Sequence, residues 1–270
     1  MTGDIQSGNN VLEILAAMFP VFLYSFLVFI LVPKGFLSGR RARRYFITGF
    51  IAPIMVYAFS YVFPHWREPI SPFADFNTLG YNAFIQVGVI EELCKFLTFA
   101  WVFSQRRNAG FDTPISVIYY SMMASAGFAL IENVTYLMDY GNGVLFIRAI
   151  SAILMHMITG VIMGYFIQKA YIYKTVLFEK ISLFERFKIK FHRIKFVIYG
   201  ISAAVLFHGV YDLTVMLPYN LYQDYFIVLV LAFGFVIGRL MLSEGIRLSI
   251  ELRKKNYKKD IEFNKISKKK

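Results

Sequence analysis

Long apolar stretches alternate with short polar or basic connections along the chain. A helix needs roughly 20 predominantly apolar residues to cross the hydrocarbon core of a bilayer. Seven stretches reach about that length: residues 11–33, 45–63, 81–104, 113–138, 144–168, 196–217 and 226–243. The pattern therefore predicts an all-α fold, a polytopic membrane helix bundle with about seven transmembrane helices.

The composition supports a membrane protein. Of the 270 residues, 57% are hydrophobic, and the mean hydropathy is +0.54, which few soluble domains of this length reach. The first apolar stretch lacks the basic leader and the small-residue cleavage site of a secretory signal, so we expect a retained span. The single cysteine, Cys94, excludes an intrachain disulfide and a thiolate metal cluster.

The formal net charge of +12 would indicate a nucleic-acid partner in a soluble protein, but its distribution indicates membrane topology instead. Lys and Arg gather on alternate connections: 5 in residues 34–44, 2 in 105–112, 8 in 169–195 and 11 from residue 239 onward, which is 26 of the 29. The connection 64–80, on the other side, carries one. The positive-inside rule therefore places the N-terminus outside and the C-terminus in the cytosol, in contact with the lipid bilayer and not with nucleic acid. We expect residues 1–243 to form the membrane domain and residues 244–270 a basic cytosolic tail.

A few ionisable side chains lie inside the predicted spans, where each costs about 2.5–3.5 kcal/mol on insertion scales and usually faces the bundle interior. They are Glu91, Glu92 and Lys95 in the third span, Glu132 in the fourth, Arg148 and His156 in the fifth, and His208 and Asp212 in the sixth. At about 1.5 Å per residue, the carboxylates and histidines lie roughly 8–18 Å below the predicted outer boundary. This shared level, on helices that run in opposite directions, predicts one interior site in the outer half of the membrane. Arg148 is expected to snorkel to the outer interface and is left out of the site.

The spacing of these residues also fits a shared site. Glu91 and Lys95 are four apart, which permits an internal ion pair that offsets the cost of burial. His208 and Asp212 are also four apart, so the aspartate can orient the imidazole. The fourth span adds two further candidates beside Glu132: Phe128 on the same helix face, and the adjacent Asn133.

Two carboxylates and two histidines at one depth permit three kinds of chemistry. A glutamate can activate water for hydrolysis while histidines stabilise the oxyanion or bind a metal. The same groups can relay protons or bind a coupling ion in a transporter, or bind a metal for structure only. The zincin signature HExxH is absent. If a divalent metal such as zinc binds, the expected ligands are His156, His208 and Glu132; the cofactor is otherwise undetermined.

Four short motifs occur in order on four consecutive spans: EELCK at residues 91–95, FALIE at 128–132, HMITG at 156–160 and HGVYD at 208–212. This set resembles the PrsW family of bacterial intramembrane proteases, whose motifs read EExxK, FxxxE, a His-bearing span and HxxxD. The family is more distantly similar to the CAAX prenyl protease and bacteriocin-immunity group. From that group the chain departs in having Lys95 four residues after Glu91, and Glu132 in place of a histidine.

The resemblance implies an intramembrane endopeptidase of the bacterial plasma membrane, with catalytic spans at about 81–217. Such a protein makes the extracytoplasmic, or site-1, cut in a single-pass anti-sigma factor and so activates sigma-factor signalling in a stress response. We predict catalytic roles for five residues: Glu91, Glu92, Glu132, His156 and His208. Four others are predicted to support them: Lys95, Phe128, Asn133 and Asp212. Either glutamate of the pair can be the general base, with Glu92 preferred. A coupled transporter or a non-catalytic membrane sensor is the alternative.

Overall fold

The structure is a computed structural model that describes residues 10–63, 74–105, 113–140, 150–175, 183–218 and 222–267. Every regular element in these ranges is helical, which confirms the all-α prediction. The elements are α1 (Asn10–Leu31), α2 (Gly39–Gly49), α3 (Ile51–Val62), α4 (Phe76–Tyr81), the π-helix η2 (Asn82–Val89), α5 (Ile90–Ser104), α6 (Pro114–Tyr140), α8 (Ala152–Thr175), α9 (Leu183–Met216) and α10 (Gln223–Ser267).

Six helical stretches are long and apolar enough to cross a membrane within the part of the chain that the structure describes. They correspond to six of the seven predicted spans. The remaining predicted span, the third in the chain at residues 81–104, is made of α4, η2 and α5, which follow one another without a break. Each of these segments is too short to count as a span by itself. The crossing predicted from hydropathy is therefore present as a helix that is divided by a π-helical segment.

Helix ends differ from the predicted span ends. Helix α2 begins at Gly39 inside the predicted basic connection, and α10 continues to Ser267 with no break at residue 243. Helix α8 begins at Ala152, eight residues after the predicted start of its span. Hydropathy marks where a helix is apolar, whereas backbone hydrogen bonds continue through polar residues as well. Arg148, which we expect to snorkel to the outer interface, lies outside the described residues.

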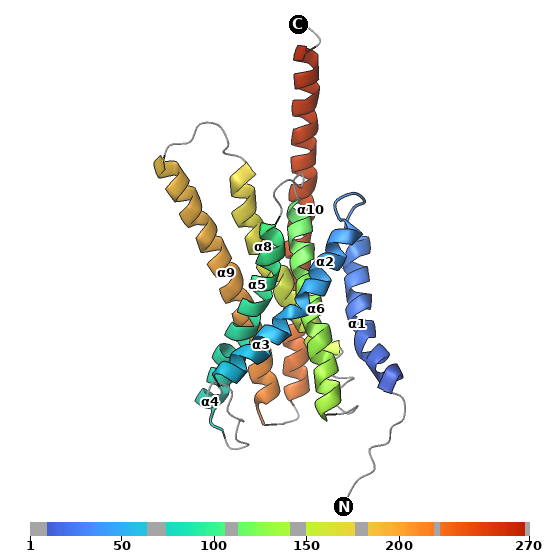
Figure 1. Ribbon diagram of the computed structural model, residues 1–270, viewed down its shortest axis with the longest axis vertical. Helices are drawn as coiled ribbons and strands as arrows, with labels where there is room; N and C mark the ends of the chain where they lie inside the picture. Colours follow the sequence, from blue (N-terminus) through green and yellow to red (C-terminus); the bar gives the residue numbers. More distant parts are fainter. Residues whose placement is uncertain are drawn as a thin grey trace, which may run out of the picture.

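Helix α6 lies at the centre of the bundle, between α2 on one side and α8 on the other (Figure 1). Small residues let α6 and α8 approach closely: a Cβ added at Gly160 would lie 2.9 Å from Met122 Cα, and one at Gly164 would lie 2.8 Å from Ile118 Cα. Both glycines therefore serve helix packing, as their spacing predicts.

The closest helix contact joins α2 to α6 at two glycines. A Cβ added at Gly49 would lie 2.1 Å from the carbonyl oxygen of Ala124, and one at Gly127 would lie 2.1 Å from that of Phe46. Real Cβ atoms do not approach so closely, so any side chain here must separate two backbones. The helices can cross at this distance only because both positions lack a side chain.

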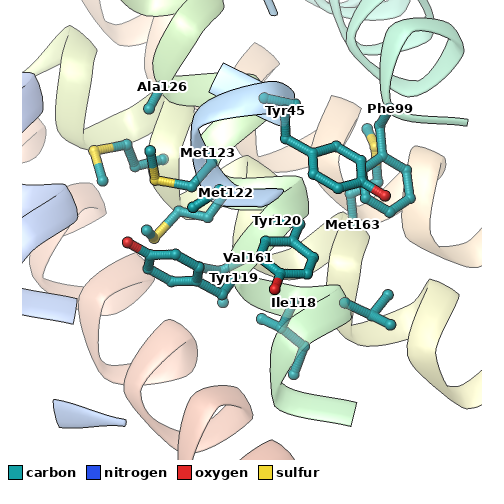
Figure 2. Packing of buried hydrophobic residues seen from close by; sticks show 14 of the residues in the cluster. Tyr45, Phe99, Ile118, Tyr119, Tyr120, Met122, Met123, Ala126, Val161 and Met163 are labelled. Carbon is teal, nitrogen blue, oxygen red and sulfur yellow. The ribbon is translucent and has the colours of Figure 1, made fainter. Parts of the chain in front are cut away.

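Aromatic rings fill the space between α2, α5 and α6 (Figure 2). Tyr45 stacks on Tyr120 at 5.1 Å between ring centroids and an interplanar angle of 8°, and on Phe99 at 5.3 Å and 27°. Ring stacking of this kind adds to the free energy gained from burying the rings. Phe99 lies one turn after Lys95 on α5, so this contact fixes the helix that carries the predicted site.

The glycine contact gives a direct test of the packing. We expect Gly127→Ala to reduce the free energy of unfolding by about 1–3 kcal/mol, because the added methyl group forces two backbones apart. Thermal unfolding of the purified protein in detergent measures the change. Gly80→Ala is the matched control, since nothing lies within 4 Å of a Cβ at that position. Equal unfolding temperatures for Gly127→Ala and Gly80→Ala would contradict the close approach.

Candidate active site

The structure brings the predicted site residues together from four elements. Helix α5 contributes Glu91, Glu92 and Lys95, α6 contributes Phe128 and Glu132, α8 contributes His156, and α9 contributes His208 and Asp212. The two glutamates are the second and third residues of α5, directly after the π-helix η2. π-Helical turns frequently occur at functional sites.

Lys95 connects three of these elements, although its side chain is only 1% exposed. Its Nζ lies 2.8 Å from Glu92 Oε1 and 3.7 Å from Glu91 Oε2. The same Nζ lies 2.9 Å from His156 Nδ1 and 4.1 Å from the centroid of the Phe128 ring. The predicted pair with Glu91 is therefore present, but the closer carboxylate is that of Glu92.

His208 lies between carboxylates on both sides of its ring. Nδ1 is 2.9 Å from Glu92 Oε1, so Nδ1–H donates to an oxygen that also accepts from Lys95. Nε2 is 3.2 Å from Asp212 Oδ2 and 3.8 Å from Glu91 Oε2. The predicted pairing of His208 with Asp212 is present, and it directs Nε2 toward Glu91.

His156 lies across from His208, with ring centroids 5.2 Å apart and an interplanar angle of 85°. Its Nε2 is 2.6 Å from Glu132 Oε2, and its ring meets the edge of Phe128 at 5.1 Å. His156 lies four residues after the start of α8, about 6 Å along the helix axis.

A cavity of about 480 Å³ opens beside these groups. Its polar lining includes Glu91, Glu132, His156, His208 and Asp212. The remaining walls are largely apolar and aromatic, which is typical of sites that bury part of a ligand and orient it with a few polar groups.

The two adjacent glutamates differ in what they face. Glu91 lines the cavity, whereas Glu92 and Lys95 are not among its lining residues. Glu92 is 0% exposed and holds both Lys95 and His208 through one oxygen. Asn133 is buried and is likewise not among the lining residues. The geometry thus gives Glu91 the position from which a carboxylate can act on a molecule in the cavity.

Sequence reasoning missed the walls of the cavity. Pro53, Val56 and Tyr57 of α3 line one side. Tyr211 lines another and donates a hydrogen bond from its hydroxyl to Ser151 Oγ at 2.8 Å. Apolar and aromatic residues in a membrane span do not reveal from sequence whether they face lipid, a neighbouring helix or a cavity. Tyr211 lies inside the motif HGVYD, which is the one signal that could have singled it out.

Distances alone would permit a metal ion. Glu91, His156 and His208 form a buried group within the described residues whose donor atoms all lie within 4.8 Å of one another. This group contains Glu91 where the sequence suggested Glu132.

The hydrogen bonds of His156 are not those of a residue that binds a metal ion. Since an ammonium group only donates, His156 Nδ1 accepts from Lys95, and the proton of the neutral ring is on Nε2, facing Glu132. His156 then has no lone pair left for a metal. As arranged, the donor set does not fit a metal ion held by three protein ligands.

Comparison with known proteins agrees with the motifs. The family described as PrsW family intramembrane metalloprotease matches residues 42–238. A protein named Protease PrsW from Oceanobacillus iheyensis is 36% identical over 101 residues, which is 37% of this chain and 46% of the relative. Protease PrsW of Bacillus subtilis is 31% identical over 154 residues, 56% of this chain and 63% of the relative. That of Clostridioides difficile is 27% identical over 202 residues, 73% and 74% of the two chains.

The matched regions span less than two thirds of the length of the first two of these relatives. No solved structure matches the chain. The family match nevertheless covers most of the chain, from within α2 to within α10, and contains all four elements that carry the site. The chain therefore belongs to the PrsW family of intramembrane proteases, and it is a multi-pass protein of a bacterial plasma membrane.

Proposed function

We propose that this chain is an endopeptidase that hydrolyses a peptide bond of a single-pass membrane protein within or beside the outer half of the bilayer. The observation that carries the proposal is the position of Glu91, the carboxylate of the EELCK motif that faces the cavity beside two histidines. Family membership favours hydrolysis over the alternatives of ion-coupled transport and sensing.

In the proposed reaction, Glu91 accepts a proton from a water molecule in the cavity as the water oxygen attacks the scissile carbonyl carbon. The carbonyl oxygen becomes the oxyanion of a tetrahedral intermediate. Glu91 then delivers the proton to the leaving nitrogen, the carbon–nitrogen bond breaks, and a carboxylic acid and an amine result, which become carboxylate and ammonium when the acid proton passes to the amine. A positioned general base of this kind contributes about 10²–10⁴-fold to the rate.

The two histidines supply the groups that stabilise the oxyanion. His208 Nε2 faces Glu91 and Asp212 at the cavity, and His156 Nε2–H faces Glu132. A carbonyl oxygen that enters between the rings can replace a carboxylate as the acceptor of these N–H groups. Donors that are fixed before reaction stabilise developing negative charge without reorganisation.

The location of the cavity supports a cut on the extracytoplasmic side. Its lining includes Ser151 just before α8, Met216 at the end of α9, and Ile227 in the second turn of α10. The basic connection from α1 to α2 lies at the opposite end of the bundle (Figure 1). Since basic connections are cytosolic, the cavity lies toward the outer surface.

The resemblance to the PrsW family makes an anti-sigma factor the substrate that we propose. A single-pass protein has one segment that crosses the outer leaflet, and the apolar cavity walls can accept such a segment once it is locally unwound. The cut would be the first of the signalling cascade, the site-1 cut.

Replacement of the proposed base tests the mechanism. We expect Glu91→Gln to reduce cleavage of a co-reconstituted single-pass substrate by about 10²–10⁴-fold, because an amide cannot accept the proton from water. The variant should still capture the substrate in a pull-down, since binding does not need the base. Glu251→Gln is a matched control, because Glu251 is exposed on α10 far from the cavity. Full activity of Glu91→Gln would contradict the assignment, and wild-type protein that transports an ion and cuts no substrate would contradict the proposed function.

The position of the cut tests the sidedness. We expect mass spectrometry of the two products to place the new termini in the outer half of the substrate's transmembrane segment or just outside it, because the cavity lies at the end of the bundle that the positive-inside rule assigns to the outer side. A substrate with its membrane orientation reversed should not be cut at the same bond. Products that end in the cytosolic half of the segment would contradict this placement.

A further inference from the structure

We propose that Lys95 is a positioning residue that directs the Nε2–H group of His156 into the site, and that hydrolysis by this chain consequently needs no divalent metal. This inference deepens the proposed function and rests on it. It differs from what the family's description as metalloproteases implies.

The ammonium group of Lys95 donates to groups that belong to the candidate active site. An ammonium group has three N–H donors. The nearest acceptors of the Lys95 group are Glu92 Oε1 at 2.8 Å and His156 Nδ1 at 2.9 Å, and Glu91 Oε2 lies at 3.7 Å. The Phe128 ring covers the group from another direction at 4.1 Å. The ammonium group therefore neutralises the carboxylates of α5 and donates to His156 at the same time.

This contact and the opposing Glu132 carboxylate together decide which nitrogen of His156 carries the proton. Because Lys95 can only donate, Nδ1 must accept, and Nε2–H donates to Glu132 Oε2 at 2.6 Å. A histidine that binds a metal shows the opposite arrangement: one nitrogen binds the ion and the other donates its N–H to a carboxylate, a carbonyl or a water. His156 has a donor at the place where a metal-binding histidine has an acceptor.

His208 provides an internal comparison. Its Nδ1–H donates to Glu92, and its Nε2 faces Glu91 and Asp212. Because carboxylates only accept, Nε2 of His208 is a donor as well, and the ring directs N–H groups to acceptors on both sides. Neither histidine therefore offers a lone pair toward Glu91, so the group Glu91, His156 and His208 lacks two of the three ligands that a metal would need. The ammonium of Lys95 is the cation around which the carboxylates are arranged.

Nitrogen NMR of the full chain in lipid, with ¹⁵N-labelled histidine, measures this arrangement directly. The chain contains four histidines, and a His156→Gln sample assigns the signals of His156. We expect one protonated nitrogen and one unprotonated, hydrogen-bonded nitrogen in His156, and no change in either signal on addition of zinc. The same preparation, treated with a strong chelator, should hold no stoichiometric metal and should cut its substrate at an unchanged rate.

Two variants of Lys95 separate positioning from a structural role. In Lys95→Met the donor to Nδ1 is lost, so the Nδ1 signal should move to that of a nitrogen without a hydrogen bond, and cleavage should fall by about 100-fold because only Glu132 still orients the ring. In Lys95→Arg a donor remains, and both the hydrogen-bonded Nδ1 signal and part of the activity should return. The NMR signal of the wild-type chain remains informative even if Lys95→Met fails to fold.

Several results would overturn the inference. They are zinc that stays bound in stoichiometric amount after chelation, a zinc-dependent shift of His156 that is absent in His156→Gln, or cleavage that is lost on chelation and restored by zinc. In each of these cases the protein could still be a protease. Failure to cut any single-pass substrate, with the His156 signals as expected, would instead overturn the proposed function.

Discussion

The buried ammonium of Lys95 is the interaction on which the rest of the site depends. In a membrane interior an unpaired charge is expensive, so each group that contacts Lys95 is held there by the cost of leaving it. Glu92 neutralises the ammonium and orients His208, and His156 is fixed by the same nitrogen. Glu91 is thereby left at the cavity, close to both rings. Two adjacent carboxylates in one motif thus face different surroundings, Glu92 the buried ion pair and Glu91 the cavity, and the proposed mechanism gives them different roles for that reason.

The bundle keeps this arrangement through close backbone contacts. Helix α6 approaches α2 through Gly49 and Gly127 and approaches α8 through Gly160 and Gly164. The α6–α8 contact fixes the separation between Glu132 and His156, which hydrogen-bond across it. The stack of Tyr45 on Phe99 fixes α5 against α2 on the other side (Figure 2). In lipid, where hydrophobic burial does not drive helix association, such packing has to supply much of the stability.

The amino-acid sequence predicted which residues form the site better than it predicted how those residues are arranged. Polar residues in apolar spans are expensive enough to mark function, so the predicted carboxylates and histidines do meet in one place. Helical spacing also predicted the pairing of His208 with Asp212. It could not distinguish Glu91 from Glu92 as partners of Lys95, because residues three and four apart are both neighbours on a helix. Contacts between helices depend on helix rotation and on where each helix begins. Neither the cavity wall from α3 nor the start of α8 at Ala152 could therefore be read from hydropathy.

The measurement that most directly tests the central claim, direct attack by water activated at Glu91, is a single-turnover cleavage in ¹⁸O-labelled water. Mass spectrometry would then follow both the products and the peptide of the enzyme that contains Glu91. Direct attack predicts ¹⁸O in the new carboxyl terminus of the substrate and none in the Glu91 side chain. Label in the Glu91 carboxylate would show that this group attacks the substrate itself through a covalent intermediate, and it would contradict the assignment of Glu91 as a general base.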